Sequence, residues 1–282
     1  MKKNFDLFYN NLKPSIMEIK DYVDYQKVFN NVYKRDSDLK LLNQVLKSDN
    51  PVKELELVLE SNPSIKTLIP NLIAIRKNII QTIDREINIG QNSSIEDVLE
   101  LIEKSGIIRF FKEKKITNII DYLIGLEVGM DTNARKNRVG KIMENKCEQI
   151  LKQKELNFYK QIKLKEMEKH FPEYDFSLLL NEFDDKTADK LIDFVIKHNN
   201  IYYLMEVNFY SSSGSKLNET CKSYMYLSDK INKYENIKFI WITDGWGWQQ
   251  TKNQIKDAYQ NIKYLYNLEE LEKNNFNLLV EE

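Results

Sequence analysis

Residues 191–210 read LIDFVIKHNNIYYLMEVNFY, and this stretch decides the fold. Two runs rich in β-branched and aromatic residues, 191–196 and 201–210, flank the polar tetrapeptide Lys197–Asn200. Apolar runs of this length around a short polar segment are typical of two antiparallel strands joined by a tight turn. The stretch therefore predicts a β-hairpin in the C-terminal half of the chain.

The segments on either side of the hairpin predict one more strand and two helices. Residues 238–243 (KFIWIT) form a third apolar run, and we expect helices over residues 215–230 and 139–154. The resulting order is helix, strand, strand, helix, strand, helix. We therefore expect an α/β (α+β) fold in which helices flank a mixed sheet.

The first part of the chain has a different pattern. Up to about Gly125, apolar residues recur at three and four positions, as in Leu39, Leu42 and Leu46. This period is that of amphipathic helices. We expect a helical region over residues 1–125 and the α/β core over residues 126–282.

Composition limits the classes of protein that this chain can belong to. Forty-two Lys and Arg oppose forty-three Asp and Glu, so charge-driven binding requires a local patch. Two cysteines, Cys147 and Cys221, are too few for a disulfide framework and favour a reducing compartment. No segment approaches the roughly 18 apolar residues of a membrane span. We expect a soluble, cytoplasmic protein without a membrane partner.

Two acids fall inside the apolar strands of the hairpin. Asp193 lies in the first strand, and Glu206 follows twelve intervening residues later in the second. Burial of a carboxylate requires a neighbouring Lys or Arg or a divalent cation, and magnesium suits a site of one or two carboxylates. Asn208 shares a strand face with Glu206. This spacing is that of the PD-(D/E)XK nucleases, although a pair of structural acids also satisfies it.

The segment before the hairpin supplies further candidates. Residues 130–165 hold ten Lys or Arg against four Asp or Glu, and Glu144 lies within this stretch. Glu144 is a candidate third ligand, with a salt-bridged helix face as the alternative. Arginine matches guanine and asparagine matches adenine in the major groove. Contact with DNA would fall to this stretch, unless it is only a solvated helix face; the candidates are Arg135, Lys136, Asn137 and Arg138.

Longer strings of sequence resemble the DpnII/MboI-type type II restriction endonucleases, of the PD-(D/E)XK superfamily. The strings in the core are residues 206–220 (EVNFYSSSGSKLNET), Ser223-Tyr224 and residues 241–248 (WITDGWGW). The other strings are residues 25–33 (YQKVFNNVY), 69–76 (IPNLIAIR) and 125–138 (GLEVGMDTNARKNR). The resemblance thus covers nearly the whole chain and is more specific than the spacing of the acids.

The resemblance implies a magnesium-dependent endonuclease that cuts double-stranded DNA at GATC, 5′ of the guanine, leaving four-base 5′ overhangs. It also implies that methylation of adenine by a partner methyltransferase blocks cleavage. A palindrome is read by a two-fold symmetric dimer, so we expect a homodimer. The helical region would clamp the duplex or mediate dimerisation.

One position departs from the wider nuclease motif. Asn208 stands where that motif has a lysine, so the cation would have to come from elsewhere, with Lys216 as a candidate. A lysine that only positions phosphate is an equal alternative for Lys216. The same turn and helix start supply three further DNA-binding candidates, Ser213, Ser215 and Asn218.

Two other functions remain open from the sequence. The first is a nuclease of the same core that acts on structured DNA in repair or junction resolution. The second is a DNA-binding module without catalysis, in which the acids are merely paired. Dependence on magnesium separates an enzyme from the binding module.

Overall fold

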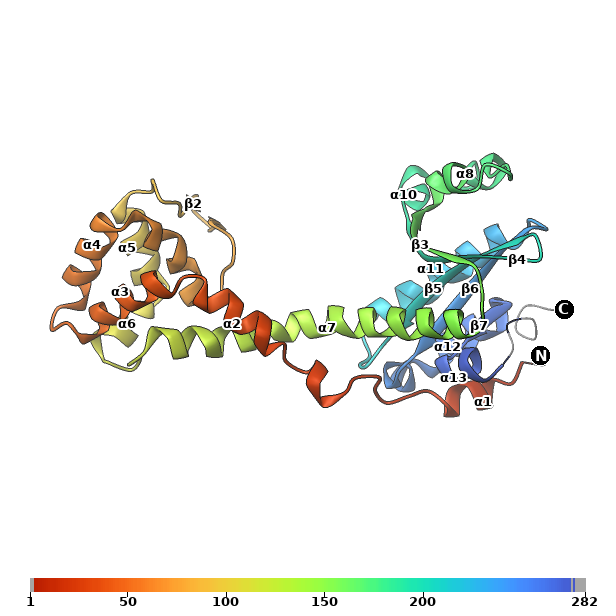
Figure 1. Cartoon of the computed structure of the whole chain (residues 1–282), viewed down its shortest axis with the longest axis horizontal. Helices are drawn as coiled ribbons and strands as arrows, with labels where there is room; N and C mark the ends of the chain where they lie inside the picture. The colour runs from red at the N-terminus through yellow and green to blue at the C-terminus, as the bar shows by residue number, and fades with distance from the viewer. Residues whose placement is uncertain (1–2, 275, 277–282) are drawn as a thin grey trace. The chain divides into compact units, whose positions relative to one another are not determined.

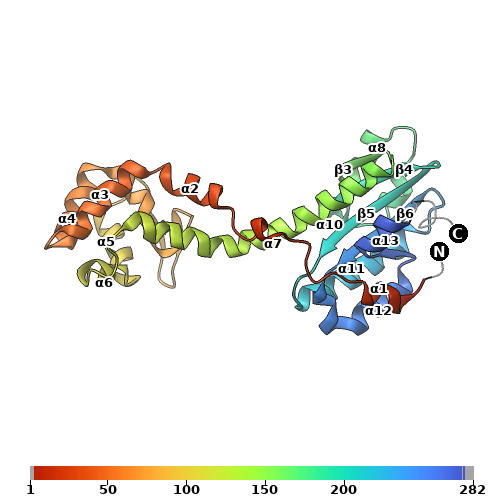
Figure 2. The ribbon, with the colours of Figure 1, turned by 60° about the horizontal axis from the view of Figure 1, so that its bottom comes forward.

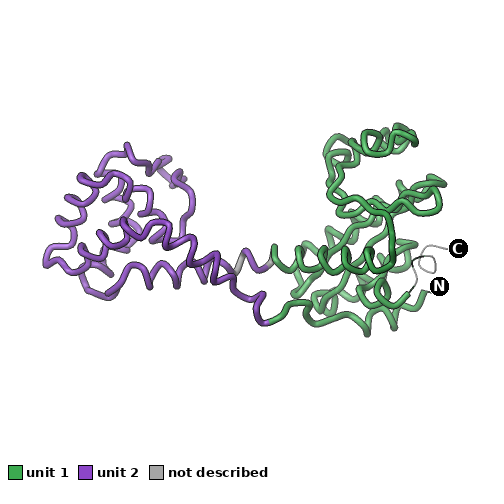
Figure 3. The backbone as a smooth tube through the Cα atoms, in the orientation of Figure 1, with its two compact units in different colours: residues 1–18, 137–282 green, residues 19–136 purple. Residues whose placement is uncertain are grey.

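The computed structural model describes residues 3–274 and 276, without the side chains of Thr132, Asn133 and Lys136. The chain forms two compact units (Figure 3). Unit 1 comprises Met1–Glu18 and Asn137–Glu282, and unit 2 comprises Ile19–Lys136. One long helix, α7 (Ile119–Gln153), contributes residues to both.

Unit 2 consists mainly of helices around one apolar core. The expected helical period is confirmed, because Leu39, Leu42 and Leu46 are all buried in that core. Ser94 caps helix α5 by accepting a hydrogen bond from the Asp97 amide at 3.1 Å. Besides α7, the elements are the 3₁₀ helix η1 (Ile19–Asp21), α2 (Tyr25–Tyr33), α3 (Asp36–Lys47), α4 (Pro51–Ser61), the 3₁₀ helix η2 (Pro63–Ile73), β1 (Ile79–Gln81), β2 (Glu86–Asn88), α5 (Ile95–Lys104) and α6 (Ile107–Lys112).

Unit 1 contains a five-stranded mixed sheet of order β3-β4-β5-β6-β7. The strands are β3 (Phe158–Lys163), β4 (Leu191–His198), β5 (Ile201–Phe209), β6 (Ile237–Asp244) and β7 (Tyr264–Tyr266). The helices are α1 (Phe5–Asn10), α8 (Met167–His170), α9 (Ser177–Leu180), α10 (Asp185–Ala188), α11 (Ser215–Ile231), α12 (Lys252–Asn261) and α13 (Leu268–Lys273). The expected α/β fold with a flanked mixed sheet is confirmed.

The predicted hairpin is β4–β5. Its register runs from Phe194 opposite Met205 to His198 opposite Ile201. The turn is Asn199-Asn200, and both residues have positive φ values of 50° and 59°. Asparagine tolerates this left-handed region, which two-residue hairpin turns require. The turn is therefore encoded locally.

The second half of the sheet is parallel. Strand β6 pairs with β5 over the register Tyr202–Ile237 to Phe209–Asp244, and β7 pairs in parallel with β6. Helix α11 makes the crossover between β5 and β6, and α12 makes the one between β6 and β7 (Figures 1 and 2). These crossovers place two helices on the sheet.

Both faces of the sheet are covered. One face packs against α1, α11 and α12, with Phe8, Leu227 and Ile255 in the same buried cluster. The other face packs against the end of α7 and against α13, through Met143 and Leu271. Strand β5 is apolar except at Glu206 and Asn208, because most of its residues are buried on both faces. Among the described residues, no helix is long and apolar enough to cross a membrane.

Asp244, at the end of β6, joins three segments of unit 1. Its carboxylate accepts hydrogen bonds from the amides of Lys13 at 2.6 Å, Gly245 at 2.7 Å and Leu268 at 3.2 Å. The Asp244 side chain is fully buried, so these bonds replace its water. This contact explains why residues before Glu18 belong to the unit that contains the sheet.

We expect Gly245→Ala to destabilise unit 1 by about 2 kcal/mol or more. Gly245 has φ of 112°, and an added Cβ would lie 2.2 Å from the carbonyl oxygen of Tyr210. Gly129→Ala in α7 is the control, because an added Cβ there meets no atom within 4 Å. Urea unfolding of both variants measures the effect. Equal stability of the Gly245→Ala variant and the parent would contradict the prediction.

Candidate active site

The hairpin brings two carboxylates together. Asp193 on β4 lies one residue beyond Phe194, whose partner in the register is Met205, and Glu206 lies one residue beyond Met205 on β5. The Oδ2 atom of Asp193 accepts a hydrogen bond from the Val207 amide at 2.9 Å. The negative charge of Asp193 is among the causes that raise the pKa of Glu206. The two side chains therefore form one electrostatic site.

Glu206 is buried, and its two oxygens have different surroundings. Only 3% of the residue is exposed. Oε2 lies 3.0 Å from Nζ of Lys190 and accepts a hydrogen bond from the Tyr224 hydroxyl at 2.6 Å. Oε1 is buried without a hydrogen-bond partner among the described residues. Burial raises the pKa of Glu206 to about 7, with Lys190 and Tyr224 opposing the rise.

Asp193 is less enclosed than Glu206. Its Oδ1 atom accepts a hydrogen bond from Nε2 of Gln161, on β3, at 3.1 Å. Burial raises the pKa of Asp193, and the nearby charge of Glu144 raises it further. Asp193 is thus held by one backbone amide and one side-chain amide, and it still favours a cation nearby.

Asn208 lies on the same strand face as Glu206, as the alternation of β5 requires. Its Oδ1 atom accepts a hydrogen bond from the indole Nε1 of Trp241, on β6, at 2.9 Å. The ring of Tyr224 packs edge-on against Trp241, with centroids 4.9 Å apart. Asn208 is therefore a neutral residue held in place by an aromatic neighbour.

Glu144, on α7, lies near the pair but is not part of a closed ligand cage. Its carboxylate pairs with Nζ of Lys141 at 3.0 Å, while the next acid on the helix, Glu148, pairs with Lys152 at 2.8 Å. In the part of the chain that the structure describes, no group of three or more His, Cys, Asp or Glu residues is placed to hold a metal ion. A third-ligand role for Glu144 stays a prediction.

Two carboxylates nevertheless fit magnesium. This ion keeps several waters and commonly takes one or two carboxylates from the protein, with substrate phosphate completing its shell. The Oε1 atom of Glu206 is a buried acceptor to which no described residue donates, and the charge of Asp193 is close enough to act on Glu206. A divalent cation bound by these two residues would offset the free-energy cost of burying the Oε1 atom of Glu206.

The predicted DNA-binding stretch lies in the middle of α7, across the boundary between the units. Arg135 donates from Nε to the carbonyl oxygen of Tyr22 at 3.1 Å and stacks over the Tyr22 ring at 5.4 Å. Asn137 is exposed and Arg138 is half-buried. The side chain of Lys136 lies outside the described residues. Contact of these four residues with DNA stays a prediction.

The remaining predicted DNA contacts cluster at the start of α11. Ser213, Ser215 and Lys216 are exposed, and Ser213 hydrogen bonds to Gln250. The side-chain oxygen of Asn218 is instead buried without a partner among the described residues, and Asn218 lines a cavity of about 230 Å³ between α11 and α12. Asn218 thus faces the neighbouring helix, whereas the other three face outward.

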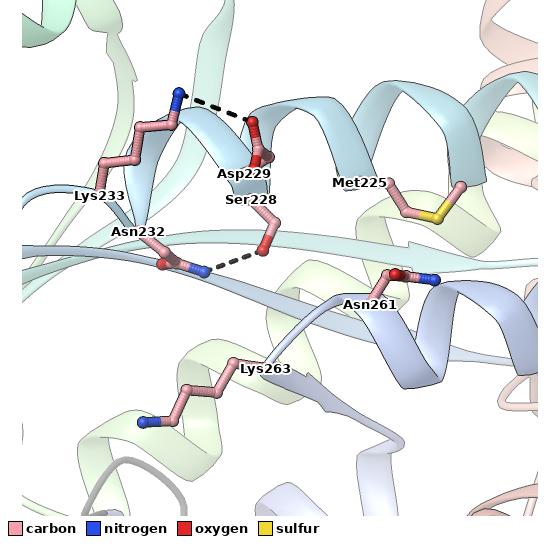
Figure 4. Close-up of a pocket in the computed structure, with 7 residues that line it drawn as sticks. All are labelled: Met225, Ser228, Asp229, Asn232, Lys233, Asn261 and Lys263. Atoms are coloured by element: carbon pink, nitrogen blue, oxygen red, sulfur yellow. Dashed lines mark hydrogen bonds and ion pairs between the residues drawn. The ribbon is translucent and has the colours of Figure 1, made fainter.

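Figure 4 shows a second cavity, of about 590 Å³, at the far ends of α11 and α12. Its polar groups pair with each other, since Asn232 bonds to Ser228 at 2.9 Å and Lys233 lies 3.8 Å from Asp229. None of the residues predicted for the active site lines it. The residues that line it are Met225, Ser228, Asp229, Asn232, Lys233, Asn261 and Lys263.

Sequence reasoning missed three residues that contact the acid pair. Lys190 comes directly before β4, and Gln161 comes from a strand that the sequence did not predict. Tyr224 was part of the string Ser223-Tyr224, but nothing in the string says that it reaches Glu206. Of the three, only Lys190 could have been proposed from the sequence, because it lies three residues before Asp193.

A mixed sheet with helices on both faces, carrying two nearby carboxylates on its central hairpin, is consistent with an α/β nuclease core. The model of a family described as DpnII restriction endonuclease matches residues 4–277 of the chain. The chain therefore belongs to the DpnII restriction endonuclease family and is a type II restriction enzyme, a site-specific deoxyribonuclease that acts on double-stranded DNA.

Individual relatives agree with this assignment. The type II restriction enzyme DpnII of Streptococcus pneumoniae is 36% identical over 283 residues, covering 96% of each chain. MboI of Moraxella bovis is 31% identical, over 95% of this chain and 93% of its own. MjaIII of Methanocaldococcus jannaschii is 34% identical, over 94% of this chain and 95% of its own. No solved structure matches the chain.

The pKa of Glu206 predicts how stability depends on pH in EDTA. Between pH 4.5, the usual value, and about 7, the folded protein holds a proton that the unfolded chain has lost. Stability contributed by this group is therefore lost as pH rises through that window. Relative to the parent, Glu206→Gln should gain on the order of 1–3 kcal/mol of unfolding free energy between about pH 4.5 and pH 8. Urea unfolding across this range measures the difference, and a difference that stays constant would contradict the prediction.

Proposed function

We propose that this enzyme hydrolyses double-stranded DNA at GATC, 5′ of the guanine on each strand, leaving four-base 5′ overhangs. We further propose that it requires Mg²⁺ and that adenine methylation of the site blocks it. The observation that carries the chemistry is the pair Asp193 and Glu206, in which the buried Oε1 atom of Glu206 has no hydrogen-bond partner in the described part of the chain. The resemblance of its sequence strings to the DpnII/MboI type carries the choice of GATC.

Asp193 and Glu206 would hold the metal, with Glu144 as a third ligand or as a group that acts through Asp193. When bound, Mg²⁺ would stabilise charge on the scissile phosphate and lower the pKa of the attacking water. Asn208, fixed by Trp241, would orient that water or a phosphate oxygen through its amide. Lys216, exposed in the first turn of α11, would contact phosphate.

Recognition would use the α7 stretch and the start of α11. Arginine and asparagine side chains read base edges, whereas serine and lysine contacts to phosphate set the register on the duplex. We propose that two copies of the chain act as a homodimer on the palindrome, with the helical region as clamp or dimer contact. An adenine methyltransferase would protect host DNA in the cytoplasm. The residues concerned are Arg135, Lys136, Asn137, Arg138, Ser213, Ser215, Lys216 and Asn218.

Digestion of plasmid DNA tests substrate, cofactor and specificity together. Adenine-unmethylated and adenine-methylated plasmid are each incubated with the enzyme in Mg²⁺ and in EDTA, and the fragment ends are sequenced. We expect discrete fragments with 5′-GATC ends from the unmethylated plasmid in Mg²⁺ alone.

Other outcomes assign other functions. Fragments with different ends would overturn the GATC assignment but retain the nuclease. Intact plasmid in all four reactions, combined with cleavage of a four-way junction, would favour a nuclease for structured DNA. Binding without cleavage of either substrate would favour a non-catalytic module.

Variants of the acid pair test the site. We expect Asp193→Asn and Glu206→Gln each to lower the single-turnover cleavage rate by roughly 1,000-fold or more, because a lost metal ligand forfeits several kcal/mol of transition-state stabilisation. Binding of a GATC duplex, measured by gel shift in EDTA, should persist. Glu173→Gln is the control, since Glu173 is an exposed acid that pairs with Lys197, a residue of strand β4. Parental cleavage rates in both site variants would refute the assignment.

A further inference from the structure

We propose that Lys190 supplies the positive charge of the active site, in place of the lysine that the nuclease motif would have at Asn208. This inference rests on the proposed metal-dependent cleavage. It assigns a role to a residue that neither the motif nor the sequence strings single out.

Lys190 lies next to the buried carboxylate of Glu206. It directly precedes β4, and its Nζ atom lies 3.0 Å from Oε2 of Glu206. The same ammonium lies 5.2 Å from the centroid of the Tyr224 ring. Its side chain is 28% exposed, whereas the side chain of Glu206 is 4% exposed. The lysine thus reaches from the surface to the buried carboxylate.

The two other residues considered near the site, Asn208 and Lys216, are less well suited to supply a positive charge to the acid pair. Asn208 is neutral, and its carbonyl oxygen is occupied by the Trp241 indole. Lys216 is exposed in the first turn of α11, where it can meet phosphate without touching the acids. Among the ion pairs described for Glu206, the partner cation is Lys190. The ammonium beside the acid pair therefore belongs to Lys190.

The arrangement around Glu206 leaves a place for a second cation. Lys190 and Tyr224 both approach Oε2, whereas Oε1 has no partner among the described residues. A divalent ion at Oε1 would neutralise the carboxylate from the other side. With the charge of Glu206 neutralised by that ion, the partly exposed ammonium of Lys190 can pair with a phosphate oxygen, to which it offers three donors.

A purely structural role for Lys190 makes a different prediction. If the lysine only neutralises buried Glu206, then saturating Mg²⁺ replaces its charge, and a neutral variant cleaves like the parent. If the lysine also stabilises charge on the phosphate, saturating Mg²⁺ does not restore the rate. The cleavage rate at saturating Mg²⁺ and enzyme therefore separates the two roles.

The test compares Lys190→Met with Lys230→Met as a matched control. Lys230 also pairs with a glutamate, Glu182, at 2.7 Å, lies 5.9 Å from the ring of Tyr226 and is 26% exposed. We expect Lys190→Met to lower the single-turnover rate on the cleaved plasmid site by 100-fold or more at saturating Mg²⁺, and Lys230→Met to change it less than threefold. A rate for Lys190→Met within threefold of the parent overturns the proposal.

Calorimetric titration of the metal-free proteins with Mg²⁺ provides a second readout. Removal of a cation that competes for Glu206 should leave Mg²⁺ affinity unchanged or increase it. An affinity that falls tenfold or more would show that Lys190 acts only by positioning Glu206 and would overturn the proposal. If Lys190→Met does not fold, Lys190→Gln carries the same expectations, because its amide can still donate to Oε2.

Failure of this inference differs from failure of the proposed function. If the parent enzyme cleaves no plasmid, the proposed function fails, whatever Lys190 does. If the parent cleaves and Lys190→Met cleaves equally well, only the role of Lys190 fails.

Discussion

A carboxylate buried in the central strand of the sheet is the constraint on which the site depends. Strand β5 is covered by helices on both faces, so its side chains lie in an apolar interior. Glu206 interrupts this strand, and an ionised carboxylate in such a place is costly unless it has partners. The structure provides a lysine, a tyrosine and a backbone-anchored aspartate around it, yet none of the described residues donates to its Oε1 atom. A site that is incomplete in this way favours a cation.

The mixed topology of the sheet supplies these partners from distant parts of the chain. The antiparallel hairpin places Asp193 beside Glu206, and β3 adds Gln161. The parallel half requires a crossover helix, and α11 carries Tyr224 back over the sheet to reach Glu206. Strand β6 then contributes Trp241, which fixes Asn208. The antiparallel and parallel halves of the sheet thus contribute different residues to the candidate site.

Helix α7 contributes residues to both units. Its C-terminal part packs under the sheet and brings Glu144 near Asp193. Its N-terminal part belongs to unit 2, where the buried Glu127 pairs with Arg76 at 2.7 Å and accepts a hydrogen bond from Asn31 at 3.0 Å. The family model matches residues 4–277, so the match spans both units.

The local pattern of the sequence determined the hairpin, its Asn-Asn turn, the third strand and the helical period of the first part. These features depend on neighbours in the chain, where alternation, period and turn chemistry act directly. Four strands escaped prediction. Strand β3 mixes polar and apolar residues, and β1, β2 and β7 are each only three residues long. The packing of residues 1–18 on the sheet unit also escaped, because it rests on contacts such as that of the Lys13 amide with Asp244.

The proximity of Asp193 and Glu206 was predictable from the sequence, because both lie on one hairpin and are separated by only twelve residues. The partners of Glu206 were decided only by the tertiary structure. Tyr224 reaches it through the crossover of α11, and Lys190 reaches it because β4 begins directly after that lysine. The placement of Glu144 beside, rather than within, the acid pair was decided in the same way. The physical reason is that burial and ion pairing depend on which segments pack together, and spacing along the chain does not encode that packing.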